Sequence, residues 1–157
     1  MKIVAEFLDI NYKPCDKPRK IDMIVLHSTG SDDVNGVISW FKNPASQVSA
    51  HYVIDKDGTV YKLVRLNDIA WHAKEYNSRS IGIEIVHSIL KPTTKEQRIA
   101  LVELVAELIK NISTIKYLQG HFELSRMKSD PYERTIVTDL RSYFRLYNIR
   151  DENKGTI

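Results

Sequence analysis

Three polar side chains, His27, Glu84 and His121, stand where predicted strands end or are interrupted, and a fourth, Asp130, precedes Pro131 in a polar loop. A strand end holds a side chain on a rigid scaffold and leaves it accessible, as a catalytic or metal-binding group requires. Two imidazoles and one carboxylate suit a catalytic zinc ion, because three protein ligands leave one tetrahedral position for water. A partly buried carboxylate such as Glu84 would have a raised pKa and could act as a general base near neutral pH.

The residue pattern alone leaves other interpretations of these side chains open. A lone histidine is more often a surface residue or a hydrogen-bonded core residue than a metal ligand, and Glu84 could be half exposed on its strand. The sequence has no HExxH motif, and His27 lies far from His121 along the chain. Spacing therefore does not by itself support a zinc site.

Composition limits the class of protein. The chain has 157 residues, of which 43% are hydrophobic and 27% charged, with a formal net charge of +3. These values fit one globular domain with a sizeable core, predicted over residues 1–157, and they argue against disorder. The single cysteine, Cys15, excludes an intramolecular disulfide and a zinc site built from several thiolates.

No apolar run is long enough for a membrane helix, and Glu6 and Asp9 interrupt the N-terminal stretch, which does not read as a signal peptide. We expect a cytoplasmic protein, or one released to the cell wall through a holin if it is phage-encoded. The pI near 8.9 fits an anionic partner, a nucleic acid or a cell-wall polymer, and equally fits ordinary solubility charge. The basic residues are scattered and form no nucleic-acid recognition motif.

The elements that would position these side chains can be outlined from the pattern. Strands are expected at 21–26, 51–54, 59–64, 81–86 and 115–118. Asp57-Gly58 predicts a hairpin turn between the second and third of these strands. Alternation along 81–86 places three isoleucines on one face of the strand, and Gly82, Glu84 and Val86 on the other.

Helices are expected between these strands. Asp32 or Asp33 could begin a short helix that ends at Asn43-Pro44, and Thr93 or Thr94 begins a long one. The buried stripe of the long helix would be Leu101, Leu104, Val105, Leu108 and Ile112. Thr138 would cap a last helix. Residues 11–20, 65–79 and 122–137 look like loops, and the tail 150–157 is expected to fray. The predicted fold class is α/β, with a central mixed β-sheet flanked by helices.

Five motifs occur in one order, namely IVLHSTG at 24–30, SAHYVIDKDGTVYKLV at 49–64, AWHA at 70–73, NSRSIGIEIV at 77–86 and GHFELSRMKSDP at 120–131. Together they resemble the zinc-dependent N-acetylmuramoyl-L-alanine amidases of the type-2 amidase family. This family includes AmpD-like enzymes, T7-type phage lysozyme and the animal peptidoglycan recognition proteins. The resemblance covers about residues 21–147 and implies the fold of that family.

The resemblance also implies roles for particular residues. His27, His121 and Asp130 match the three zinc ligands, with Asp130 in the K-x-D-P arrangement of the AmpD-like branch. Glu84 matches the general base, and Lys128 matches the residue that stabilises the oxyanion.

Other positions match the substrate groove or depart from the family pattern. Trp71 and His72 match the wall of the substrate groove, Asn77 is a further candidate substrate contact, and His51 matches a structural position. His87 receives no role. Ala50 stands where the phage and animal branches carry a tyrosine, and Tyr132 replaces the usual glycine after Asp-Pro, so we expect a different loop path there.

The function implied is zinc-dependent hydrolysis of the amide between N-acetylmuramic acid and L-alanine, in peptidoglycan or a muropeptide, for wall recycling or lysis. The alternative is a module that binds peptidoglycan without cutting it. We expect a monomer that binds neither nucleic acid nor membranes.

Overall fold

The centre of the molecule is a six-stranded mixed β-sheet. The computed structural model describes the backbone of residues 1–7 and 10–154 and the side chains of residues 1–7 and 10–151. The strand order across the sheet is β1 (Ile3–Ala5), β5 (Val60–Lys62), β4 (Tyr52–Ile54), β7 (Ser80–Ile85), β3 (Met23–Ser28) and β8 (Tyr117–Gly120). A separate antiparallel pair joins β2 (Tyr12–Lys13) to β6 (Ile69–Ala70).

Four neighbouring strands of the sheet run parallel. β4 pairs with β7, β7 with β3, and β3 with β8, all in parallel register, whereas β4 and β5 form the antiparallel hairpin. The carboxyl ends of the parallel strands therefore meet at one edge of the sheet, which is where such sheets place ligands. The predicted mixed sheet with flanking helices is confirmed.

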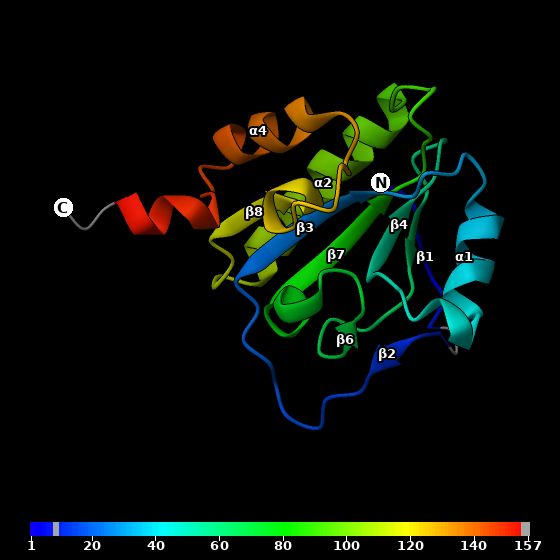
Figure 1. Cartoon of the computed structure of the whole chain (residues 1–157), viewed down its shortest axis with the longest axis horizontal. Coiled ribbons are helices and arrows are strands. Elements are labelled where there is room, and N and C mark those ends of the chain that lie inside the picture. Colours follow the sequence, from blue (N-terminus) through cyan, green and yellow to red (C-terminus); the bar gives the residue numbers. More distant parts are fainter. Residues whose placement is uncertain (8–9, 155–157) are drawn as a thin grey trace.

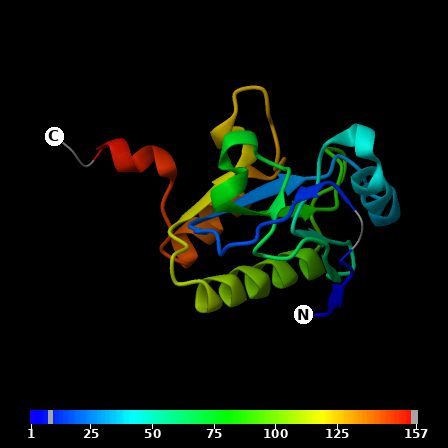
Figure 2. The same ribbon diagram turned by 90° about the horizontal axis from the view of Figure 1, so that it is seen from below.

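Helices cover the two faces of the sheet differently. α2 (Lys95–Asn111) and α4 (Arg134–Tyr143) share one hydrophobic core with the three isoleucines of β7. α1 (Val34–Lys42) packs in a second core that includes Val53 and Val86. Figure 1 labels these helices, and in Figure 2 α2 lies below the sheet while the segment around residues 121–132 rises above it.

The strong local signals of the sequence produce the expected elements. Thr94 caps α2 in a capping box. Its hydroxyl accepts from the Gln97 backbone N–H at 3.0 Å, and the Gln97 side-chain oxygen accepts from the Thr94 backbone N–H. Asp33 caps α1. The β4–β5 turn contains Gly58 at φ 81°, a backbone conformation that glycine adopts without strain.

Two predicted boundaries are wrong near the C-terminus. Residues 122–137 are not simply a loop, because α3 (His121–Leu124) and the first turn of α4 lie there. Thr138 lies inside α4 and does not cap it, and its hydroxyl donates to the Thr135 carbonyl at 2.9 Å. The helix begins at Arg134, four residues before Thr138, and its N-cap is Glu133.

The remaining differences concern short elements without a readable period. The predicted loop 65–79 contains β6 and a 3-10 turn, η2 (Lys74–Arg79), and two short strands, β1 and β2, precede the first predicted strand. Short 3-10 turns also span η1 (Pro44–Ser46) and η3 (Ile149–Lys154). The end of the tail, residues 155–157, lies outside the described residues. Among the described residues, no helix combines the length and apolar character needed to cross a membrane.

Candidate functional site

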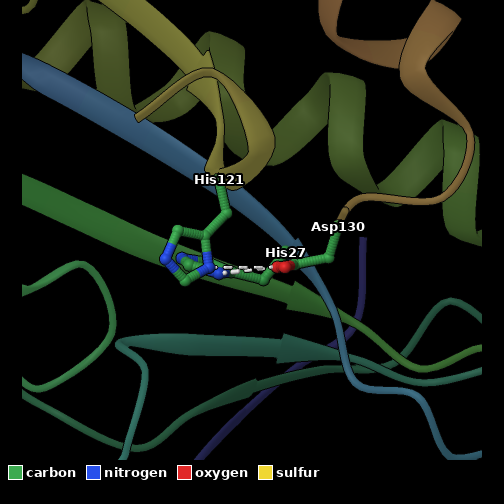
Figure 3. A group of neighbouring side chains, drawn as sticks. All are labelled: His27, His121 and Asp130. Atoms are coloured by element: carbon green, nitrogen blue, oxygen red, sulfur yellow. Dashed lines mark hydrogen bonds and ion pairs between the residues drawn. The ribbon is translucent and has the colours of Figure 1, made fainter. Parts of the chain in front are cut away.

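Three side chains that are far apart in sequence converge at the carboxyl edge of the parallel strands. His27 lies in β3, His121 follows β8 directly, and Asp130 lies in the loop after α3. Oδ2 of Asp130 is 3.1 Å from Nδ1 of His27 and 3.3 Å from Nδ1 of His121. Figure 3 shows the three side chains pointing toward one another from these separate segments.

The donor set fits a tetrahedral metal ion. One donor atom from each of the three residues lies within 4.8 Å of the other two. Zinc–nitrogen and zinc–oxygen bonds of about 2.0–2.1 Å in tetrahedral geometry separate neighbouring donor atoms by about 3.3 Å. The two measured separations from Asp130 agree with that spacing. Two imidazoles and one carboxylate are also the ligand types that catalytic zinc uses.

The loop that carries Asp130 is held by hydrogen bonds on both sides of the carboxylate, to α3, to β3 and to the segment before α2. The Asp130 carbonyl accepts from the Phe122 backbone N–H at 2.9 Å. The Tyr132 backbone N–H donates to the Ser28 hydroxyl at 3.1 Å. Glu133 accepts from the backbone N–H and the hydroxyl of Thr93 at 2.7 and 2.8 Å. These bonds hold an irregular segment in a defined position.

Glu84 reaches the same site from β7. It is the register partner of His27 across the β3–β7 pair, so the two side chains leave adjacent parallel strands on the same face. Among the described residues, Oε2 of Glu84 is buried and has no hydrogen-bond partner. Burial, reinforced by the negative charge of Asp130, raises the pKa of Glu84 to about 8, and Lys128 opposes the shift. The predicted alternation along this strand is confirmed.

Burial and the Asp130 contacts also shift the pKa values of the ligand set. Burial lowers the pKa of His27, and the hydrogen bond to Asp130 only partly offsets it. Burial acts to raise the pKa of Asp130. The hydrogen bonds to His121 and His27 outweigh this effect, so the pKa lies well below its ordinary range. A neutral imidazole beside an ionised carboxylate is the protonation state that binds a metal.

A cavity of about 360 Å³ opens over these residues. It is lined by the three converging side chains and Glu84. Further lining residues are Lys128, Ser129, Trp40, Val48 and Trp71. Lys128 is exposed, so its ammonium can reach a bound ligand. The structure therefore brings Trp71, Lys128, Glu84 and the three candidate ligands around one cavity.

His72 also lines this cavity, but only 9% of the residue is exposed, and its ring contacts His27. Burial and the neighbouring histidines keep its pKa well below the ordinary value. Asn77 is not among the residues that line the cavity, and its side-chain oxygen accepts from the backbone N–H groups of His72 and Ala73 at 3.0 and 2.6 Å. Substrate contact by Asn77 stays a prediction, and its observed role is to hold the His72 segment.

His51 is fully buried away from the cavity. Its Nδ1 accepts from the Gly82 backbone N–H at 3.0 Å, and its Nε2 lies 3.1 Å from the Asp68 carbonyl. Burial and the nearby Arg19 guanidinium lower its pKa to about 3. This environment agrees with a structural position.

Sequence reasoning missed several residues that hold the site in place. Nε2 of His87 lies 2.6 Å from the hydroxyl of Ser28, which in turn accepts from Tyr132. Glu123 accepts from the Gly120 backbone N–H at 2.9 Å and from Arg141 at 2.7 and 2.8 Å, and so ties the His121 turn to α4. Only the tertiary fold reveals these partners. The one sequence signal was Glu123 in its capping position, three residues after Gly120.

Comparisons with known proteins agree with this site. A family model described as N-acetylmuramoyl-L-alanine amidase matches residues 17–133. N-acetylmuramoyl-L-alanine amidase A of Achromobacter lyticus is 42% identical over 90 residues, 57% of this chain and 49% of the relative. The 1,6-anhydro-N-acetylmuramyl-L-alanine amidase AmpD of Haemophilus influenzae is 34% identical over 96 residues, 54% of this chain and 52% of the relative. The chain spans about half the length of these curated relatives.

Solved structures show the same fold. The amidase LysC from Clostridium intestinale superposes with a TM-score of 0.75 at 22% identity, covering 94% of this chain and 99% of that one. Drosophila PGRP-LB gives a TM-score of 0.71 at 18% identity, covering 96% and 98%. At these identities the likeness concerns the fold.

Proposed function

Because this chain belongs to the N-acetylmuramoyl-L-alanine amidase family, we propose that it hydrolyses the amide between N-acetylmuramic acid and the L-alanine of a peptidoglycan stem peptide. The observation that carries the proposal is the convergence of His27, His121 and Asp130 at one cavity with Glu84 beside them. The names of the two curated relatives support the same bond as the target.

The proposed cofactor is one zinc ion. His27, His121 and Asp130 would hold it, each through one donor atom of the set that fits tetrahedral zinc. When bound, zinc lowers the pKa of a water molecule towards about 7 and polarises a carbonyl.

Glu84 is the proposed general base. Glu84 lines the cavity, and its buried Oε2 makes no hydrogen bond to another described residue, so the carboxylate is available to take a proton from the attacking water. The pKa of about 8 belongs to the metal-free chain. A dication at the neighbouring site would lower it, which favours the ionised carboxylate at neutral pH.

Lys128 stabilises the charge that develops on the substrate. As the water oxygen bonds to the lactyl carbonyl carbon, the carbonyl oxygen becomes an oxyanion, and the Lys128 ammonium on the cavity wall can donate to it. Glu84 then returns its proton to the amide nitrogen. The carbon–nitrogen bond breaks and the stem peptide leaves as an amine.

The cavity walls suit a substrate that is part sugar and part peptide. Trp71, Trp40 and Val48 contribute apolar surface to the cavity, and polar side chains such as Lys128 and Ser129 also line it. We propose peptidoglycan or a soluble muropeptide as the substrate class. Comparing turnover on anhydro-muropeptide with turnover on whole sacculi separates a wall-recycling role from a lytic one.

Mass spectrometry of the products from a defined N-acetylmuramoyl peptide tests the proposed reaction. The expected products are the free muramic acid carboxylate and a peptide with a free L-alanine amine. Glu107→Gln, an exposed carboxyl on α2, is a matched control for Glu84→Gln and should cleave as the unchanged chain does. Binding of the peptide without any hydrolysis would contradict the proposal and favour a recognition module.

A further inference from the structure

We propose that His72 is a positioning residue for the metal ligand His27, a role that rests on the proposed zinc site. Nδ1 of His72 lies 3.0 Å from Nε2 of His27, on the side of the His27 ring opposite Asp130. Nε2 of His72 lies 3.2 Å from the hydroxyl of Ser80, and that hydroxyl is 2.7 Å from the Tyr76 carbonyl. We call this row, from His27 through His72 and Ser80 to Tyr76, the His72 relay.

The donors and acceptors of the His72 relay have a single consistent arrangement. The Tyr76 carbonyl can only accept, so the one hydrogen of the Ser80 hydroxyl points at it. The Ser80 oxygen then accepts from the Nε2–H of His72. In a neutral imidazole the other ring nitrogen is an acceptor. Nδ1 of His72 therefore accepts from the Nε2–H of His27.

This arrangement decides which nitrogen of His27 is free. With its proton on Nε2, the ring presents the Nδ1 lone pair toward Asp130 and His121, as a metal ligand must. The second nitrogen of a ligating histidine commonly donates to a fixed acceptor, which sets the tautomer and the ring orientation. In this chain, that acceptor is Nδ1 of His72, whose ring contacts Ser80 at the start of β7.

The surrounding chain is shaped to hold the His72 ring in place. A Cβ atom at Gly82 would lie 2.6–2.8 Å from three atoms of the ring, so only glycine lets β7 approach it this closely. Asn77 fixes the backbone on the other side through its bonds to His72 and Ala73. A buried polar network with every member satisfied is rigid, and rigidity is what a positioning role needs.

A groove-wall role and a positioning role predict different measurements. Zinc affinity, measured by competition with a chromophoric chelator on folded protein, reports on His27 without any substrate. His72→Leu removes the acceptor for His27, and we expect zinc to bind about 10–100-fold more weakly. His72→Asn can present a side-chain oxygen in place of Nδ1, and we expect it to keep most of the affinity. Unchanged zinc affinity with a raised KM in His72→Leu would overturn the proposal and leave a groove-wall residue.

A milder pair of variants keeps the test sound if His72→Leu does not fold. Ser80→Ala removes only the anchor of the relay, and we expect a smaller loss of zinc affinity. Thr114→Val is its matched control, because it removes one hydroxyl bond to a carbonyl, that of Ile21 at 2.6 Å, without touching the relay. Equal zinc affinities for the two variants would contradict the proposal.

Nitrogen-15 NMR of the imidazole rings in the zinc-loaded protein reads the relay directly. We expect the His72 proton on Nε2 and a slowly exchanging Nε2–H on His27, and a proton on Nδ1 of His72 would overturn the assignment. Neither this spectrum nor the zinc affinity depends on amide hydrolysis. A chain that binds zinc as described but cleaves nothing would contradict the proposed function and leave the relay intact.

Discussion

The two faces of the central sheet use the same strands for opposite purposes. On the face toward α2 and α4, Ile81, Ile83 and Ile85 of β7 are at most 1% exposed and pack in a hydrophobic core. On the other face, the intervening Gly82 and Glu84 lie among buried imidazoles beside the cavity. The first face contributes hydrophobic packing. The second face, which also packs Val53 and Val86 against α1, in addition places groups whose burial costs stability but makes them reactive. Alternation along one strand thus separates folding from chemistry.

The largest expected effect comes from removing a metal ligand on the polar face. His121→Ala leaves two candidate ligands, and we expect loss of stoichiometric zinc together with a fall of turnover to background. That fall should exceed the ~10²–10⁴-fold typical of a single proton-transfer group. Metal analysis and a turnover assay on the same sample check both. Full zinc occupancy in this variant would show that the ion lies elsewhere.

Glu84→Gln should affect chemistry and spare the fold. Loss of the general base lowers turnover by ~10²–10⁴-fold. We expect zinc affinity to be retained and the free energy of unfolding to change by less than about 1 kcal/mol, since the side chain keeps its shape. Kinetics and urea unfolding measure the two. Undiminished turnover would remove Glu84 from the mechanism.

Ile83→Ala, one residue earlier on β7, should lower stability and leave the chemistry intact. Truncating this buried side chain leaves a cavity, and we expect the free energy of unfolding to fall by about 2–5 kcal/mol. Below the unfolding transition, turnover per folded molecule should be close to that of the unchanged chain. Ile83→Val, with an expected cost of about 0.5–1.5 kcal/mol, provides the graded control. A specific loss of turnover in Ile83→Val would break the separation between the two faces.

Acid should weaken the polar face through His51. The pKa of His51 is about 3 in the folded chain and about 6.5 when unfolded, so between these values only the unfolded state binds the proton. Its contribution to stability is complete above about pH 6.5 and declines as pH falls towards 3. Between pH 7 and pH 5 the decline is about 2 kcal/mol.

Urea unfolding of metal-free protein at the two pH values measures this decline. His27 and His72, whose pKa values are also lowered, shift stability in the same direction, whereas Glu84, whose pKa is raised to about 8, shifts it in the opposite direction. The contribution of His51 is therefore the difference from His51→Asn. A shallower pH dependence is expected in the variant. Equal pH dependence in the two proteins would refute the assignment to His51.

The sequence predicted best what local chemistry determines. The Asp57-Gly58 turn, the Thr94 capping box and the alternation around Glu84 each depend on a few adjacent residues, and all three are present. Strands of two or three residues, such as β1 and β2, are too short to show a period. The start of α4 was misplaced because Thr138 looks like a cap but lies within the helix.

The candidate site could be predicted only in part. His27 lies near the end of β3 and His121 follows β8, yet nothing in their spacing brings them to Asp130, and the ordered motifs supplied that link. The relay through Ser80 and the Ser28–His87 contact depend on which strands become neighbours, so they emerge only from the sheet order. His72 illustrates the limit, because the motif placed it at the cavity and the fold added its contact with His27.

Titration of zinc into metal-free protein, with turnover on an N-acetylmuramoyl peptide followed at each point, tests whether the proposed zinc site carries the activity. We expect activity to rise in proportion to added zinc and to saturate at one ion per chain, held by His27, His121 and Asp130. Full turnover by the metal-free protein in the presence of a chelator would contradict it.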